Sequence, residues 1–322
     1  MKYLSINSGK DKIEVSRIVL GTDYFGTTVG EDTAFRLMDI YVEEGGNCLD
    51  TARVYASWLP NGEGASERTV GKWLRSRGNR NNIIISTKGG HPPIGHMDQG
   101  RLSRRELEKD LDESLRALGT DYIDIYWLHR DDATHPVEDI METLASFIAK
   151  GKVRAIGCSN WQVGRIEEAN RFAAQSGLTP FCSSQIQWSL ASTTPEAYGD
   201  LTLVCMNKHE YEWYLKNSFP VFAYSSQAKG FFARAAADGL EAINQKAKSR
   251  FSSPENIARL EKVKKYATES GLTVTAVVLG YILCNRVPAV AVVGCKNTGQ
   301  MRDSLAAADV SLSQDIIKWL GE

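Results

Sequence analysis

Four side chains with complementary chemistry stand at or just after the ends of apolar runs in this sequence. Asp50 closes the run GNCLD, and Tyr55 follows it in the stretch TARVY. Lys88 closes NIIISTK, and His129 closes YIDIYWLH. Each residue alone has an ordinary explanation, since an acid at a strand end often caps a turn and a lysine there is often solvated. Together, however, they form an acid–base set that can protonate a carbonyl oxygen.

Tyrosine needs assistance to act as an acid, because its hydroxyl has a pKa of about 10. A neighbouring ammonium stabilises the phenolate, and a carboxylate holds that ammonium without leaving a buried charge unpaired. An imidazole at the same site can orient the carbonyl oxygen or share its proton. The set therefore predicts that Asp50 fixes Lys88, that Lys88 lowers the pKa of Tyr55, and that Tyr55 is the general acid when hydride attacks C=O.

The elements that must position these side chains alternate between short β-rich runs and longer helical patterns. The predicted strands cover 17–21, 46–50, 82–88, 122–129, 153–159, 181–187, 219–225 and 288–294. The predicted helices cover 31–44, 66–77, 103–119, 136–151, 161–177, 209–217, 254–271 and 298–309. This alternation is typical of a (β/α)8 TIM barrel, in which the carboxyl ends of the strands share one site.

The flanking segments complete this architecture. Residues 5–15 predict an N-terminal β-hairpin that closes the bottom of the barrel, and the last ten residues predict a C-terminal helical extension. Ser103 with Glu106 predicts a capping box, and Gly119 a helix stop. The first strand lacks the GxGxxG turn of an open dinucleotide-binding sheet. No linker or repeat divides the chain, so residues 1–322 are predicted to form a single domain.

Composition excludes several classes of partner. The formal net charge is −1, which gives no electrostatic footprint for nucleic acid and no polybasic membrane anchor. The first residues lack the apolar core of a signal peptide, and no apolar stretch reaches the roughly 18 residues that span a bilayer. The six cysteines are scattered without a CxxC pair, which indicates a reducing compartment and no structural zinc. We expect a cytoplasmic protein without a metal site.

A series of motifs in fixed order carries a family resemblance. They are LDTARVY (49–55), SERTVGKWL (66–74), ISTKGG (85–90), DLDESLRALGTDYIDIYWLHRD (110–131) and GKVRAIGCSNW (151–161). With them the chain resembles the aldo-keto reductase superfamily over nearly its whole length, in particular a bacterial branch with an extended YASWLPNGEG loop (55–64). The resemblance implies that the four residues above are the family's Asp–Tyr–Lys–His tetrad. It also implies a nicotinamide dinucleotide bound across the barrel mouth without a Rossmann fold.

The resemblance further implies which residues hold this cofactor, although each also has an ordinary strand-end or turn role. Grouped by cofactor part, they are Thr22 and Asp23 for the nicotinamide ribose; Ser159, Asn160 and Gln185 for the carboxamide; Tyr224, with Ser225 beside it, for the nicotinamide ring; and Gln227, Lys229 and Gly230 for the pyrophosphate.

The last cofactor segment departs from the pattern of family members strict for NADPH, in which a Lys–Ser pair and a later Arg grip the 2′-phosphate. Gly294 and Cys295 occupy the positions of the pair, and Gln300 that of the Arg. Lys296 could supply a charge and Asn297 a hydrogen bond from neighbouring positions. By the same resemblance, Asp303 would face the adenine amino group. We expect NADP(H), with NAD(H) as the alternative.

The substrate side combines aromatic and polar candidates. The aromatic ones are Phe25, Trp58, Trp127, Trp161 and Trp188, and the polar ones are Arg53, His91, Arg130 and Asp131. Aromatic platforms mixed with hydrogen-bonding groups suit a sugar or another polyhydroxylated carbonyl compound. The extended loop resembles that of family members active in carbohydrate metabolism. Trp58 lies in that loop and is the best candidate for a pocket wall.

Two other functions compete with carbonyl reduction. The same fold family includes potassium-channel β-subunits, in which bound nucleotide acts as a redox sensor with slow turnover. A barrel hydrolase is the second alternative, but it needs acids at two later strand ends, where this chain has GCSN and AYSS. The natural substrate, the physiological direction, and a monomeric or homo-oligomeric state stay open.

Overall fold

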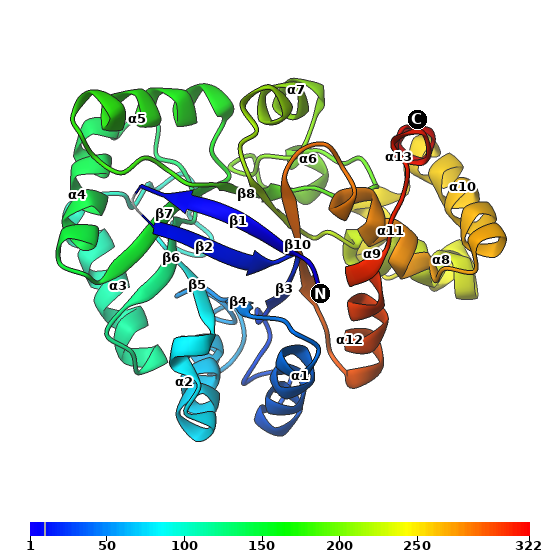
Figure 1. Cartoon of the computed structure of the whole chain (residues 1–322), viewed down its shortest axis with the longest axis horizontal. Helices are drawn as coiled ribbons and strands as arrows, with labels where there is room; N and C mark the ends of the chain where they lie inside the picture. Colours follow the sequence, from blue (N-terminus) through cyan, green and yellow to red (C-terminus); the bar gives the residue numbers. More distant parts are fainter. Residues whose placement is uncertain (10) are drawn as a thin grey trace.

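The computed structural model describes residues 1–9 and 11–322 and contains a closed barrel of eight parallel strands (Figure 1). Around the barrel the order is β10–β3–β4–β5–β6–β7–β8–β9, with β10 hydrogen-bonded to β3. The barrel strands are β3 (Ile18–Gly21), β4 (Cys48–Asp50), β5 (Ile84–Gly89), β6 (Ile123–Leu128), β7 (Val153–Ser159), β8 (Ser184–Gln187), β9 (Val221–Tyr224) and β10 (Ala289–Gly294). Each lies within one residue of, or inside, its predicted range, which confirms the (β/α)8 fold.

Helices surround the barrel on all sides (Figure 1). They are α1 (Glu31–Glu43), α2 (Ala65–Arg77), α3 (Arg104–Leu118), α4 (Val137–Ala149), α5 (Val163–Gln175), α6 (Pro195–Tyr198), α7 (Lys208–Asn217), α8 (Phe231–Asp238), α9 (Gln245–Phe251), α10 (Pro254–Ser270), α11 (Val274–Leu283), α12 (Thr298–Leu305) and α13 (Gln314–Gly321). The predicted capping box is present at α3, where the Ser103 hydroxyl accepts from Glu106 N and donates to its carboxylate. Gly119 ends α3 in a left-handed conformation, as predicted.

The N-terminal hairpin of β1 (Tyr3–Ser8) and β2 (Asp11–Ser16) lies across one end of the barrel (Figure 1). Its turn residue Lys10 lies outside the described residues. Ile6, Ile13 and Val15 are buried and pack in one cluster with barrel-strand side chains such as Ile125 and Trp127. The hairpin therefore closes the end of the barrel opposite the carboxyl ends of the strands, as the sequence predicted.

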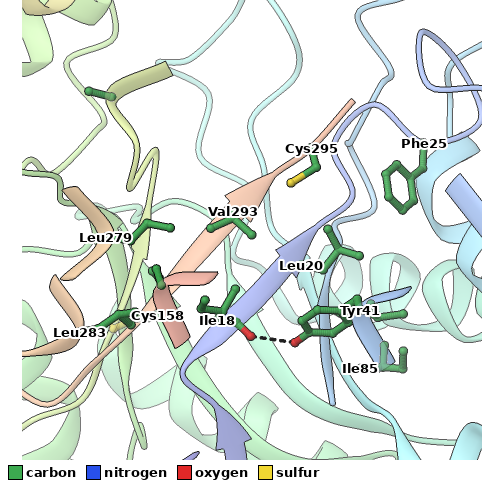
Figure 2. Packing of buried hydrophobic residues seen from close by; sticks show 14 of the residues in the cluster. Ile18, Leu20, Phe25, Tyr41, Ile85, Cys158, Leu279, Leu283, Val293 and Cys295 are labelled. Carbon is green, nitrogen blue, oxygen red and sulfur yellow. Dashed lines mark hydrogen bonds between the residues drawn. The ribbon is translucent and has the colours of Figure 1, made fainter. Parts of the chain in front are cut away.

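The first two barrel strands are tied together by Tyr41 on α1. Its hydroxyl lies 2.8 Å from Ile18 O on β3, 2.9 Å from Cys48 O on β4 and 2.7 Å from Ser16 Oγ (Figure 2). A Cβ atom at Gly46 would lie 2.2 Å from the Tyr41 ring, so only glycine fits there. This packing fixes the register of the two strands whose ends carry Thr22 and Asp50.

Helix α11 was not predicted, because it is apolar on nearly every side. Eight of its residues, including Leu279 and Leu283, are buried between β10 and neighbouring helices. A fully covered helix has no polar face, so its sequence lacks the 3.6-residue periodicity that marks surface helices. Within the described residues, no single helix is long and apolar enough to span a membrane; only α10 and α11 together have that length and composition, and they meet at 104°.

Glu210 makes the stability of the protein depend on pH. This side chain at the start of α7 is buried, and one of its carboxylate oxygens has no hydrogen-bond partner. Burial raises its pKa from 4.5 to about 7. The folded chain then holds a proton that the unfolded chain releases, so stability is lost as pH rises from about 4.5 to 7.

We expect Glu210→Gln to abolish this pH dependence and to raise the free energy of unfolding at pH 8 by roughly 2 kcal/mol. Urea unfolding at pH 5.5 and pH 8 measures the difference, and Glu269→Gln on the exposed surface of α10 is the matched control. Equal loss of stability with pH in wild type and Glu210→Gln would contradict the assignment.

Candidate active site

The four candidate residues come together at the carboxyl ends of β4, β5 and β6. The ammonium of Lys88 donates to Asp50 Oδ2 at 2.7 Å, to Thr51 O at 2.8 Å and to Tyr55 Oη at 2.8 Å. Its three N–H bonds are thereby all used, which fixes the side chain in one orientation. Both Lys88 and Asp50 are 1% exposed, so this ion pair is held in a protein interior rather than in water.

Asp50 is itself held by donors on neighbouring strands. Its Oδ1 accepts from Ser86 Oγ at 2.8 Å and from Gln185 Nε2 at 3.0 Å. The Ser86 hydroxyl in turn accepts from Trp127 Nε1 at 2.7 Å. Asp50 also accepts a longer bond of 3.4 Å from the Tyr55 hydroxyl. These donors fix the Asp50 carboxylate, which in turn holds Lys88 in place beside the phenol.

The pKa of Tyr55 differs in direction from the prediction. Burial, followed by the nearby carboxylates of Asp50 and Asp23, raises the pKa of Tyr55 well above 10. Burial also lowers the pKa of Lys88, an effect that the Asp50 carboxylate opposes. Tyr55 therefore holds its proton firmly at neutral pH. The ammonium of Lys88 lies 2.8 Å from Tyr55 Oη, a position from which it can stabilise a phenolate formed there.

His129 completes the set as a neutral imidazole. Its ring lies 5.9 Å from the Tyr55 ring and 4.7 Å from the His91 ring, both in edge-to-face contact. Burial, with His91 and Arg130 nearby, lowers the pKa of His129 well below 6.5. Its buried Nδ1 has no hydrogen-bond partner among the described residues. The other ring nitrogen, Nε2, is not a buried atom and also has no partner among the described residues, so a ligand can reach it.

The start of α2 contacts the residues that follow β3 and β4. The sequence did not reveal this feature. Ser66 Oγ donates to Thr22 O at 2.7 Å and lies 2.8 Å from both the Thr22 and the Thr51 hydroxyls. Glu67 follows Ser66 in α2, and its buried carboxylate accepts a hydrogen bond of 2.6 Å from Thr87 Oγ1 on β5. Thr51 supplies the carbonyl that Lys88 contacts, so this helix terminus helps to position the tetrad.

Beside the tetrad, Asn160 joins several expected cofactor residues into one network. It has a φ of 59°, in the left-handed region, and its Nδ2 donates to Ser159 Oγ and to His129 O. Its Oδ1 accepts from Tyr224 Oη at 2.8 Å and from Val204 N at 3.2 Å. The structure thus brings Ser159, Asn160 and Tyr224 together with the tetrad, as the sequence predicted.

A second group of expected cofactor residues surrounds the ends of β9 and β10. Lys229 and Lys296 are exposed, and neither forms a salt bridge with any described residue. Gly294 is exposed, and a Cβ there would meet only Asp23 Oδ1, at 3.8 Å. Gly230 has a φ of 82° and open space above it. Open backbone flanked by two lysines without salt-bridge partners among the described residues is an arrangement that can accept a polyanionic dinucleotide.

The remaining expected cofactor residues have protein partners. Gln227 donates to Ser304 Oγ, Asn297 caps α12 by accepting from Gln300 N, Gln300 accepts from Lys296 N, Asp303 accepts from Thr273 Oγ1, and the Thr22 hydroxyl bonds Ser66 and Asp50 O. Ser225 lies in a turn with a φ of 50°. In this structure these contacts organise the loops, so any cofactor contact from these groups adds to, or replaces, an existing hydrogen bond.

Two residues expected in the substrate wall lie in the core instead. Phe25 is 1% exposed and belongs to the main hydrophobic cluster, near Leu20 and Cys295 (Figure 2). Trp127 is 0% exposed and packs against Phe222 inside the barrel, with ring centroids 4.9 Å apart. The sequence pattern placed them near strand ends, but it did not show that their rings point inward. Both predictions are therefore corrected.

Trp58 is the aromatic candidate with an exposed ring, at 45% of its surface. Its ring lies in edge-to-face contact with that of Tyr24, with ring centroids 6.1 Å apart, so Tyr24 is a second aromatic residue beside it. Trp161 is fully buried against Phe181. Trp188 lines a separate cavity of about 230 Å³ next to α7 and α10.

Three of the four polar candidates are occupied by ion pairs. Arg130 bonds Asp200, Thr202 and His129 O; Asp131 pairs with Arg165; and Arg53 pairs with Glu63 and Glu113. These contacts fasten the loops of the mouth to one another. His91 is the exception.

No group of three or more His, Cys, Asp or Glu residues in the part of the chain that the structure describes is arranged to hold a metal ion.

Ser86, Thr51 and Ser66 are the supporting residues that the sequence reasoning missed. Ser86 could have been found, because it lies two residues before Lys88 and therefore on the same face of β5. The carbonyl of Thr51 and the hydroxyl of Ser66 carry no such signal, since their roles depend on how α2 packs against the strand ends.

Known proteins resemble this chain over most of its length. Residues 17–321 match the family model described as the aldo/keto reductase family. The norsolorinic acid reductase stcV of Emericella nidulans is 30% identical over 95% of this chain and 77% of that protein. The oxidoreductase YrpG of Bacillus subtilis is 29% identical over 98% and 94%. An aryl-alcohol dehydrogenase [NADP(+)] of Phanerodontia chrysosporium is 26% identical over 96% and 83%.

Among solved structures, a thermostable aldo-keto reductase crystallised with the inhibitor epalrestat shares the fold. The TM-score is 0.72 at 22% sequence identity, and the alignment covers 100% of this chain and 99% of the other.

Proposed function

Because the chain belongs to the aldo/keto reductase family, we propose that it reduces an aldehyde or ketone to an alcohol with a nicotinamide dinucleotide, using Tyr55 as general acid. The observation that carries the proposal is the contact of Tyr55 Oη with the Lys88 ammonium at 2.8 Å, itself 2.7 Å from Asp50. Burial favours the protonated phenol of Tyr55, and the Lys88 ammonium stabilises the phenolate that forms when Tyr55 gives its proton to the substrate. The reverse oxidation uses the same groups in the opposite order.

The proposed division of labour follows from the contacts. When bound, the nicotinamide supplies the hydride. His129, neutral and with an accessible Nε2 that has no partner among the described residues, orients the carbonyl oxygen toward Tyr55. Tyr55 then donates its proton to that oxygen, and Lys88 stabilises the phenolate that remains. Asp50 keeps Lys88 charged throughout. Ser159, Asn160, Gln185 and Tyr224 would hold the nicotinamide end of the cofactor, and Lys229 and Lys296 its phosphates.

NADP(H) is the proposed cofactor, because Lys296 lies exposed beside β10, where its ammonium has no salt-bridge partner among the described residues and lies 5.7 Å from the centroid of the Tyr24 ring. The Phanerodontia relative, whose name includes NADP(+), supports this choice. We expect Lys296→Ala to weaken NADPH binding roughly tenfold, since a charge-assisted contact to the 2′-phosphate is lost. NADH binding should change less than about twofold.

Quenching of tryptophan fluorescence gives both dissociation constants. Lys265→Ala, which removes an exposed lysine on α10, is the control and should leave both unchanged. Equal weakening of NADPH and NADH by Lys296→Ala would place Lys296 elsewhere on the cofactor.

For the substrate we propose a polar, sugar-like carbonyl compound bound between Trp58 and His91. An aryl carbonyl compound is the second candidate, favoured by the names of the norsolorinic acid and aryl-alcohol relatives and by the Tyr24–Trp58 pair. Initial rates with aldoses and with substituted benzaldehydes, under NADPH and NADH separately, distinguish the two. Cofactor binding without turnover of any carbonyl would favour the redox-sensing alternative instead.

A further inference from the structure

His91 differs from the other polar side chains at the barrel mouth in its hydrogen bonding. Arg53, Arg130 and Asp131 are each engaged by charged partners of their own chain. His91 forms one hydrogen bond, between its Nδ1 and Pro92 O at 2.6 Å. Its Nε2 has no partner among residues 1–9 and 11–322, and it is not a buried atom. Nε2 is therefore an uncommitted polar atom that a ligand can reach.

The contact with Pro92 fixes the tautomer of this imidazole. A carbonyl oxygen only accepts hydrogen bonds, so Nδ1 must carry the proton. Burial, with Arg130 nearby, lowers the pKa of His91 to about 4, so the ring is neutral at physiological pH. In a neutral ring protonated at Nδ1, Nε2 has a lone pair and no hydrogen. At neutral pH His91 thus presents a hydrogen-bond acceptor at Nε2.

The loop that carries His91 is held rigidly. Gly90 N donates to Asp110 Oδ2 at 2.8 Å, and Arg101 donates to both His91 O and Asp110. The His91 ring lies against the His129 ring, with centroids 4.7 Å apart. Two imidazoles this close can contact one small molecule together. By the proposed function His129 orients the carbonyl oxygen, so His91 lies beside the ring that holds the reacting group.

We infer that His91 is a specificity-determining residue that accepts a hydrogen bond from a hydroxyl group next to the reacting carbonyl, which makes α-hydroxy carbonyl compounds the preferred substrate class. The inference rests on the proposed reductase function. A substrate with an ether oxygen at the same place directs a lone pair at the lone pair of Nε2. Such a substrate gains no hydrogen bond and encounters repulsion, so it is discriminated against.

Hydroxyacetone and methoxyacetone test this inference, because both carry an electron-withdrawing oxygen next to the ketone and only one has a donor. We expect the wild-type protein to prefer hydroxyacetone by roughly tenfold in kcat/KM. This is the effect of about one hydrogen bond, which methoxyacetone cannot donate to His91. His91→Phe keeps a flat ring against His129 and removes the acceptor, so the ratio should approach one. His91→Gln retains an acceptor oxygen and should retain most of the preference.

The ratio is measured within each variant, which cancels differences in the fraction of active protein. Benzaldehyde, which has no neighbouring hydroxyl, serves as the reference substrate. Reduction of benzaldehyde by wild type without a preference for hydroxyacetone would overturn the inference alone, as would an unchanged ratio in His91→Phe. No turnover of any carbonyl with NADPH or NADH would overturn the proposed function and the inference with it. If His91→Phe fails to fold, the wild-type ratio and His91→Gln decide.

Discussion

Replacing Tyr55 with phenylalanine is expected to lower kcat for carbonyl reduction by about 10³-fold, within the 10²–10⁴ range typical of general acids. The substitution removes one hydroxyl and leaves the ring, so the nucleotide site should be intact. Its partners remain satisfied in part, because Lys88 still donates to Asp50 and to Thr51 O. The dissociation constant for NADPH should therefore change less than about threefold, which locates the loss in the chemical step.

Single-turnover oxidation of NADPH with an aldehyde separates this effect from product release. Tyr122→Phe provides the matched control, since it removes a phenol hydroxyl just before β6, at the closed end of the barrel. That control should reduce substrate at the wild-type rate. A Tyr55→Phe protein that retains more than a tenth of wild-type kcat would require a different proton donor.

Asp50→Asn is expected to lower the free energy of unfolding by about 3–5 kcal/mol, the cost of removing one partner from a buried ion pair. The substitution leaves Lys88 1% exposed without its carboxylate. Lys88→Met should cost less, because Asp50 retains Ser86 and Gln185 as donors. The double variant Asp50→Asn/Lys88→Met should recover most of the stability lost in Asp50→Asn, yet all three variants should be inactive.

Urea unfolding at several pH values measures these differences. In Asp50→Asn the folded pKa of Lys88 falls further below its unfolded value, so the unfolded chain binds more protons between the two. The stability of this variant should therefore rise with pH toward 10, whereas the double variant lacks that dependence. Full additivity of the two single substitutions would contradict direct coupling of the pair.

The fold was predictable because its signals are local. Short β-rich runs such as 153–159 alternate with amphipathic helices such as 103–119, and a β-strand followed by a covering helix leaves few architectures open. Strand boundaries shifted by up to three residues, as at β8, which begins at Ser184 rather than at residue 181. Helix α11 was missed for the opposite reason, since a helix buried on all sides has no periodic polar face.

The site was predictable where residue type and strand end coincide, as for Asp50, Lys88 and His129. Side-chain direction was not predictable, which is why Phe25 and Trp127 were placed in the pocket and lie in the core. The sequence also does not reveal which polar groups are already engaged. The sequence predicts Arg130 as a substrate ligand. In the structure its guanidinium donates to Asp200 and Thr202, which are distant in the chain. The catalytic and cofactor roles stay predictions.

The ion pairs at the mouth bear on substrate choice. Arg130 and Asp131 are paired with Asp200 and Arg165, so these two side chains are not free to bind the hydroxyls of a substrate. His91 and Trp58 are left as one hydrogen-bond acceptor and one exposed aromatic surface. This combination suits a small hydroxylated carbonyl compound, and it also accommodates an aromatic group next to a hydroxy ketone.

The most direct test of carbonyl reduction by this protein follows the hydride itself. NADPH labelled with deuterium on either face of nicotinamide C4 is incubated with the protein and an aldehyde, and the alcohol is analysed by mass spectrometry. We predict one deuterium on the carbinol carbon from one of the two labelled faces, and no labelled alcohol with Tyr55→Phe over the same time. Alcohol without deuterium from either face, or no alcohol with any carbonyl tested, would contradict the account.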